Sequence, residues 1–138
     1  MVGLLIVTHA NMAGELLRAA EMIIGPADQA RAIAVSREDS VEKISQALSD
    51  ACDDVARDGD GIIIMTDMFG GTPTNLSLAL TERYESEIIT GVNLPMVIKF
   101  FNSRHTAVKE LAPALRSYAA DKISVVSELL SDPSRGRR

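Results

Sequence analysis

Strand-like and helix-like patterns alternate along this chain, and the alternation constrains its fold more than any other feature. Three short apolar runs stand apart from one another: VGLLIV (2–7), RAIAV (31–35) and IIIMT (62–66). Between them, apolar residues recur at three- and four-residue spacing over 11–24 and 41–55, as in amphipathic helices. Runs that are apolar throughout are typical of strands buried on both faces. The pattern therefore predicts a parallel sheet covered by helices on both sides.

The second half of the chain continues this alternation. It predicts strands over 87–92 and 122–126, and helices over 72–83, 94–101 and 104–119. We therefore expect an α/β, flavodoxin-like, doubly wound and mostly parallel sheet in the order 2-1-3-4, with 122–126 as a final antiparallel edge strand. A single domain is expected over 1–130, followed by a flexible basic tail over 131–138.

Composition and charge narrow the class of protein. The 138 residues are 46% hydrophobic and 24% charged, the balance of a globular domain, and the formal net charge of −5 argues against nucleic acid as a partner. The single cysteine, Cys52, excludes an intrachain disulfide. No basic segment precedes the first apolar run, and no run approaches the roughly 20 apolar residues of a membrane span. We expect a cytoplasmic protein.

Two polar residues follow the apolar runs where such a sheet binds ligands. His9, one of two histidines, ends the first run, and Asp67 follows the third. In the order 2-1-3-4 these strands are neighbours, and ligands sit beyond their carboxyl ends. A carboxylate that accepts a hydrogen bond from one imidazole nitrogen leaves the other nitrogen free to attack an electrophile. The pair predicts a nucleophilic histidine; the alternative is that His9 only terminates a strand and Asp67 only caps a loop or helix.

The loop after the third run is suited to an anion. Gly70 and Gly71 let the backbone approach a ligand, and Thr72, the expected N-cap before Pro73, adds a hydroxyl donor. Amides at the starts of two helices, just after His9 and at Thr72, favour a phosphoryl group. Neither G-x-x-x-x-G-K-[ST] nor G-x-G-x-x-G occurs, so one phosphoryl group is expected rather than a nucleotide. The simpler alternative is that the glycines only form a tight turn. His105 is expected to be a surface residue.

The segments GIIIMTDMFGGTPTN (61–75) and GVNLPM (91–96), with the VTH end of the first run, resemble the mannose-family IIA component of the bacterial phosphotransferase system. The resemblance extends from Met1 to about Leu130. It implies that His9 accepts a phosphoryl group from the carrier protein HPr and passes it to a IIB partner, with no metal or other cofactor.

The same resemblance assigns roles to the matching residues. It implies that Asp67 orients His9 and that Thr72 donates a hydrogen bond to the phosphoryl group. The loop residues Phe69, Gly70 and Gly71 would shape the pocket, and Asn93, Leu94 and Pro95 would form part of its rim. Residues 122–126 are the expected interface of a homodimer, because family members often dimerise partly through the last strand.

The role of such a protein depends on its acceptor. The sequence contains no linker to a IIB domain, so the phosphoryl group would pass to a separate protein or act as a regulatory signal. Contact with a membrane would be indirect, through a sugar permease complex. Two alternatives stay open: a phosphoryl-donor subunit of dihydroxyacetone kinase, which GVNLPM favours less, and a non-catalytic regulator that binds partners according to its phosphorylation state.

One position departs from the family pattern. Family members usually carry glycine after the active histidine, where this chain has Ala10. If the backbone there needs a positive φ, alanine costs about 1 kcal/mol.

Overall fold

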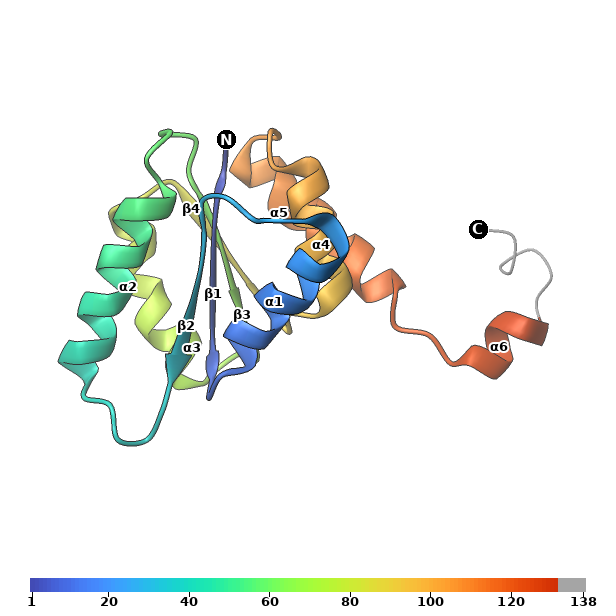
Figure 1. Ribbon diagram of the computed structural model, residues 1–138, viewed down its shortest axis with the longest axis horizontal. Coiled ribbons are helices and arrows are strands. Elements are labelled where there is room, and N and C mark those ends of the chain that lie inside the picture. Colours follow the sequence, from blue (N-terminus) through green and yellow to red (C-terminus); the bar gives the residue numbers. More distant parts are fainter. Residues whose placement is uncertain (132–138) are drawn as a thin grey trace.

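The computed structural model describes residues 1–131 and has the expected alternation of strands and helices (Figure 1). The elements in chain order are β1 (Gly3–His9), α1 (Met12–Ile24), β2 (Ala30–Val35), α2 (Val41–Val55), β3 (Ile62–Thr66), α3 (Thr72–Ser77), the 3₁₀ helix η1 (Leu78–Glu82), β4 (Ser86–Thr90), α4 (Leu94–Ser103), α5 (Val108–Asp121) and α6 (Val126–Ser131).

The four strands form one parallel sheet in the order β2-β1-β3-β4, which confirms the predicted topology. β1 lies inside the sheet, with Val7 in register with Ile33 of β2 on one side and with Thr66 of β3 on the other. The carboxyl ends of β1 and β3 therefore meet at one edge, the lower edge in Figure 1. The direction of winding reverses between these two strands, so this edge is the switch point.

Two hydrophobic layers bury the sheet. Helices α1, α4 and α5 cover one face and α2 and α3 cover the other (Figure 1). Residues of β1 alternate between the layers, since Leu4 and Ile6 belong to the first and Leu5 and Val7 to the second. Burying such a side chain stabilises the fold by about 1.5–3 kcal/mol. The inner strands are apolar throughout because both of their faces are buried.

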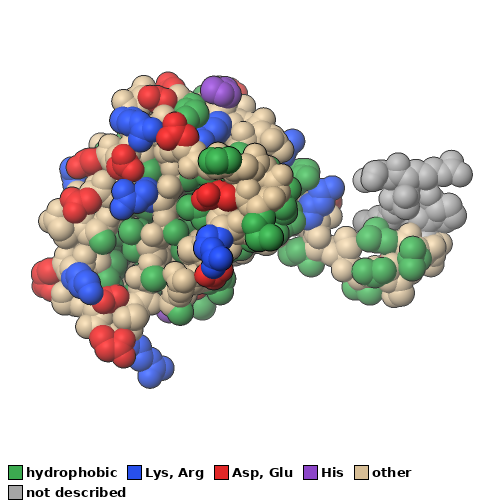
Figure 2. Space-filling model, in the orientation of Figure 1, with side chains coloured by type: hydrophobic (Ala, Val, Ile, Leu, Met, Phe, Trp, Pro, Cys, Tyr) green, Lys and Arg blue, Asp and Glu red, His purple; other side chains and the backbone are tan. Residues whose placement is uncertain are grey.

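The prediction of a final edge strand over 122–126 is wrong for this chain. Lys122 is the C-cap of α5, and Val126 begins α6, which buries none of its residues. The segment leads away from the body (Figure 1), and Figure 2 shows hydrophobic side chains exposed on it. Its β-branched residues favour a strand, but a strand needs a neighbour for its backbone N–H and C=O groups. The predicted tail lies outside the described residues, apart from Ser131.

Several helix boundaries also differ from the predictions. Thr72 is the first residue of α3 rather than its N-cap, which is Gly71, and its side chain makes no capping hydrogen bond. The helix predicted to residue 83 becomes a 3₁₀ helix after Ser77. The helix predicted over 94–101 extends to Ser103, and the one predicted over 104–119 begins only at Val108. His105 lies exposed between the two helices, as expected for a surface residue.

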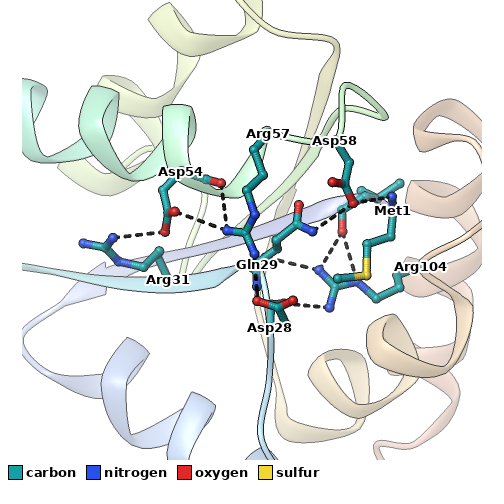
Figure 3. Close-up of polar contacts among 9 residues, drawn as sticks. Met1, Asp28, Gln29, Arg31, Asp54, Arg57, Asp58 and Arg104 are labelled. Atoms are coloured by element: carbon teal, nitrogen blue, oxygen red, sulfur yellow. Dashed lines mark hydrogen bonds and ion pairs between the residues drawn. The ribbon is translucent and has the colours of Figure 1, made fainter.

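The opposite edge of the sheet is held by a buried arginine. Arg104, which is 6% exposed, donates hydrogen bonds from Nη2 and Nε to the Val2 carbonyl at 2.8 and 3.1 Å, and from Nη1 to the Asp28 carbonyl at 2.7 Å. Figure 3 shows its guanidinium reaching the segments that precede β1 and β2. Burial lowers the pKa of Arg104, while nearby Asp28 and Asp58 oppose this effect. This network is remote from the switch point.

Within residues 1–131, no helix has the length and apolar character needed to cross a membrane.

Candidate functional site

His9 and Asp67 meet at the switch point, as the sequence predicts. Asp67 Oδ2 lies 2.7 Å from His9 Nδ1 and also accepts the His9 backbone N–H at 3.0 Å. A carboxylate can only accept, so Nδ1 carries the proton and Nε2 keeps its lone pair. The His9 side chain is 49% exposed and that of Asp67 11%. The imidazole ring is therefore open to a partner, while the carboxylate that contacts it is covered.

The hydrogen bonds around Asp67 keep its carboxyl ionised. Burial raises the pKa of Asp67, but the hydrogen bonds from the His9 ring and the His9 backbone outweigh it and hold the pKa below its ordinary 3.8. The second carboxylate oxygen accepts the Met68 N–H at 3.0 Å. Asp67 is consequently a fixed negative charge at neutral pH, able to stabilise positive charge that develops on the imidazole.

The glycine pair leaves room for His9. A Cβ on Gly71 would lie 2.8 Å from His9 Cε1 and 3.4 Å from Nε2, so a side chain there would collide with the ring beside its reactive nitrogen. Gly70 has φ of +88°, a conformation that side chains disfavour. Both glycines are thus required by the geometry of this loop, which is more than the simple tight turn considered from the sequence.

Thr72 and His9 line the same hollow. It has a volume of about 690 Å³, lies between the turn after β1 and the β2–α2 loop, and also includes Ala10 and Arg37. The exposed Thr72 side chain is therefore available to a group bound at Nε2. Phe69 does not line this hollow. Its side chain is 81% exposed and forms part of the surface of the loop after β3.

The residues predicted to form the rim begin α4 at the same edge of the sheet. Asn93 caps that helix, since its Oδ1 accepts the Met96 N–H at 3.0 Å and its Nδ2 donates to the Ala119 carbonyl at 3.2 Å. Leu94 and Pro95 form the first turn and are half-buried. In the described part of the chain no hydrogen bond joins these three residues to His9, so their role as a rim stays a prediction.

Three buried threonines support the site, and the sequence analysis assigned them no role. Thr8 Oγ1 accepts the Ala13 N–H at 2.8 Å and so fixes the start of α1. Thr74 Oγ1 donates to the Met68 carbonyl at 2.7 Å and lies 2.8 Å from Thr66 Oγ1. The sequence feature that could have indicated this support is a threonine at the end of each apolar run: Thr8 directly before His9 and Thr66 directly before Asp67.

Ala10 has the positive φ considered from the sequence. Its φ is +52°, and its N–H donates to the Val35 carbonyl at 2.9 Å. The turn that follows His9 is therefore tied to the end of β2.

This arrangement leaves His9 as the candidate nucleophile of the site. Cys52 is buried, and burial raises the pKa of its thiol to about 12, which leaves it unreactive. Over residues 1–131, no group of three or more His, Cys, Asp or Glu side chains is placed to hold a metal ion. The chemistry available to the site is attack by His9 Nε2 on an electrophile, with Asp67 balancing the charge.

Several known proteins are similar to this chain in sequence and in fold. Residues 3–115 match the family model EIIA-man, described as the PTS system fructose IIA component. YadI of Escherichia coli (strain K12), a candidate phosphotransferase enzyme IIA component by its name, is 33% identical over 77% of this chain and 73% of its own. The PTS system mannose-specific EIIAB component of the same strain is 29% identical over 75% of this chain but only 32% of its own.

A solved structure agrees with these sequence matches. The phosphotransferase system component EIIA from Streptococcus agalactiae superimposes with a TM-score of 0.82 and 27% identity, over 93% of this chain and 99% of that one. Sequence and structure therefore lead to one assignment: the chain belongs to the mannose-type family of IIA components of the phosphotransferase system.

Proposed function

We propose that this protein is a cytoplasmic phosphoryl carrier that accepts a phosphoryl group from phospho-HPr on His9 and passes it to a separate IIB protein. The observation that carries the proposal is the 2.7 Å contact between His9 Nδ1 and Asp67 Oδ2, which leaves Nε2 as the nucleophile on an exposed ring. Membership of the IIA family supports the same reaction.

Each transfer is a displacement at phosphorus. The Nε2 lone pair forms the new N–P bond while the donor's P–N bond breaks, and the electron pair of that bond returns to the donor nitrogen. The imidazole becomes positively charged, and Asp67 stabilises that charge through Nδ1. The reverse displacement, with an acceptor side chain as nucleophile, regenerates neutral His9. Backbone amides at Gly71 and Thr72 and the Thr72 hydroxyl are the donors we assign to the phosphoryl oxygens.

Apolar side chains near His9 provide a docking face for both partners. Met12, at the start of α1, and Met68 and Phe69, in the loop after β3, are 49%, 54% and 81% exposed. Exposed apolar side chains grouped around a reactive residue are typical of transient protein interfaces. Because there is one phosphoryl-accepting residue, donor and acceptor proteins must use this face in turn.

We further propose that the chain forms a homodimer through the segment 122–131, hereafter the arm. Ile123, Val125, Val126 and Leu130 are between 59% and 81% exposed, and α6 buries none of its residues. A second copy of the chain is the surface that would cover them, as the family resemblance implies.

Incubation with HPr and its phosphorylating enzyme tests the proposal directly. We expect one acid-labile phosphoryl group per chain, none on His9→Ala and an unchanged amount on the control His105→Ala. Labelling that persists in His9→Ala would exclude His9 as the carrier. Affinity purification of the phosphorylated protein then distinguishes acceptors, because recovery of a dihydroxyacetone kinase subunit without a IIB protein would favour that alternative.

A further inference from the structure

Arg37 occupies a distinctive place among the loops at the switch point. Four segments follow the carboxyl ends of the strands: 10–11, 36–40, 67–71 and 91–93. Arg37 is the only Lys or Arg in these segments, whereas Glu38, Asp39 and Asp67 are acidic. A group transferred to His9 would therefore meet one nearby cationic side chain and several carboxylates.

The pairing of β1 with β2 places Arg37 close to the nucleophile. His9 is in register with Val35, and the Ala10 N–H donates to the Val35 carbonyl at 2.9 Å. Arg37 follows two residues later and lines the same 690 Å³ hollow as His9 and Thr72. Its long side chain starts within reach of the space beside His9.

The other charged groups of this loop already have partners. Asp39 accepts the Ser36 N–H at 3.1 Å and Lys43 Nζ at 3.1 Å, and Glu38 accepts the Ser36 hydroxyl at 3.0 Å. Among the described residues, Arg37 makes neither a hydrogen bond nor an ion pair, and it is exposed. Its guanidinium is thus available to an incoming anion.

We propose that Arg37 binds the phosphoryl group on His9, a role that rests on the proposed function of His9. Phosphorylation would place a dianion on Nε2, at an edge of the sheet that already carries Asp67, Glu38 and Asp39, and a guanidinium offers two parallel N–H donors that match two phosphoryl oxygens. In the transfer, Arg37 donates to oxygens that carry charge in the transition state, while the N–P bond forms at Nε2 and the donor bond breaks. No proton is exchanged with Arg37.

A small-molecule donor separates contact with the phosphoryl group from contact with HPr. Phosphoramidate is the probe, and the rate of phosphohistidine formation is followed by ³¹P NMR for the full-length wild type, Arg37→Ala, Arg37→Lys and the control Arg18→Ala. Arg18 is 76% exposed and pairs with Glu15 on α1. We expect Arg37→Ala to be slower by about tenfold with both phosphoramidate and phospho-HPr, with partial recovery in Arg37→Lys and no change in Arg18→Ala.

Two results would overturn this role. Equal rates for wild type and Arg37→Ala with phosphoramidate would do so, and so would a loss confined to phospho-HPr, which would make Arg37 a docking residue only. Failure of the proposed function gives a different result, namely a wild type that reacts with phosphoramidate at His9 but not with phospho-HPr. Because Arg37 is exposed and unpaired, thermal unfolding of Arg37→Ala should match the wild type, which confirms that folding is not the cause.

Discussion

At the scale of single residues, the backbone of Ala10, next to His9, is strained. Its φ of +52° lies in the left-handed region, where a Cβ is disfavoured by about 1–2 kcal/mol. Glycine relieves that strain but raises the entropy of the unfolded chain, so Ala10→Gly should stabilise the protein by up to about 1 kcal/mol in urea unfolding. The control Ala114→Gly, on an exposed position of α5, should instead destabilise it by about 1 kcal/mol. If Ala10→Gly instead lowered the free energy of unfolding, the claim that Ala10 is strained would be wrong.

Asp67 belongs to the same scale, and its charge makes a testable contribution to transfer. Asp67→Asn keeps the size of the side chain but removes its charge and replaces one of its two accepting oxygens, which bind the His9 and Met68 N–H groups, with an NH2 donor. The tautomer of His9 is then no longer fixed by a carboxylate. We expect phosphorylation by phospho-HPr at pH 7 to slow by about tenfold or more while the fold is retained. Circular dichroism checks the fold, and an unchanged rate would exclude an orienting role.

The lowered pKa of Asp67 also predicts how stability depends on pH. A carboxyl whose pKa is lower in the folded state stabilises that state fully above its ordinary pKa of 3.8, and this contribution is lost as the pH falls through the lower folded value. The difference in unfolding free energy between wild type and Asp67→Asn should therefore shrink as the pH falls below 3.8. Urea unfolding across this range measures it, with Asp121→Asn as the control. A difference that grows below pH 3.8 would contradict the sign.

At the scale of elements, Thr74 joins β3, the site loop and α3. Its hydroxyl links the end of β3 at Thr66 to the Met68 carbonyl. Thr74→Val keeps the shape but removes the partner of the buried Thr66 hydroxyl and of the part-buried Met68 carbonyl, which should destabilise the protein by about 1–3 kcal/mol. Slower phosphorylation should accompany this, because the loop carries Asp67 and Gly71.

Thr81→Val is the matched control for Thr74→Val. Thr81 also donates to a backbone carbonyl, that of Leu78 at 2.7 Å, but it is exposed. Its replacement should change stability by no more than about 0.5 kcal/mol. Equal effects of the two substitutions in urea unfolding would show that the buried link has no special importance.

At the scale of the whole molecule, the arm is the proposed dimer interface, so its exposed apolar residues should determine the oligomeric state. If it forms the dimer interface, Ile123→Ser combined with Val126→Ser should convert a dimer into a monomer in analytical ultracentrifugation. The thermal unfolding of the body should change little beyond the effect of dissociation, because neither side chain is buried within the chain. Met22→Ser, at an 88% exposed position of α1, is the control and should leave the mass unchanged. A monomeric wild type, or a dimeric double variant, would contradict the proposed interface.

Much of the fold and the centre of the site follow from local pattern. The apolar runs predict β1 and β3 because inner strands buried on both faces need apolar residues at nearly every position, and the shorter run RAIAV predicts the half-buried edge strand β2. His9 and Asp67 could be paired because adjacent parallel strands end at the same edge, and the structure joins them at 2.7 Å. The supporting threonines were missed because hydroxyl residues at strand ends are common, and only their partners distinguish them.

The sequence by itself therefore determined the alternation of elements, the strand order and the pairing of His9 with Asp67 at the switch point. Only the tertiary structure decided what depends on contacts between distant segments. It showed that Ala10 adopts a positive φ, that Gly71 has no space for a side chain beside His9, and that 122–126 forms no strand within one chain. The physical reason is the same in each case: local propensity specifies what a segment favours, whereas steric space and hydrogen-bond partners are supplied by the segments packed against it.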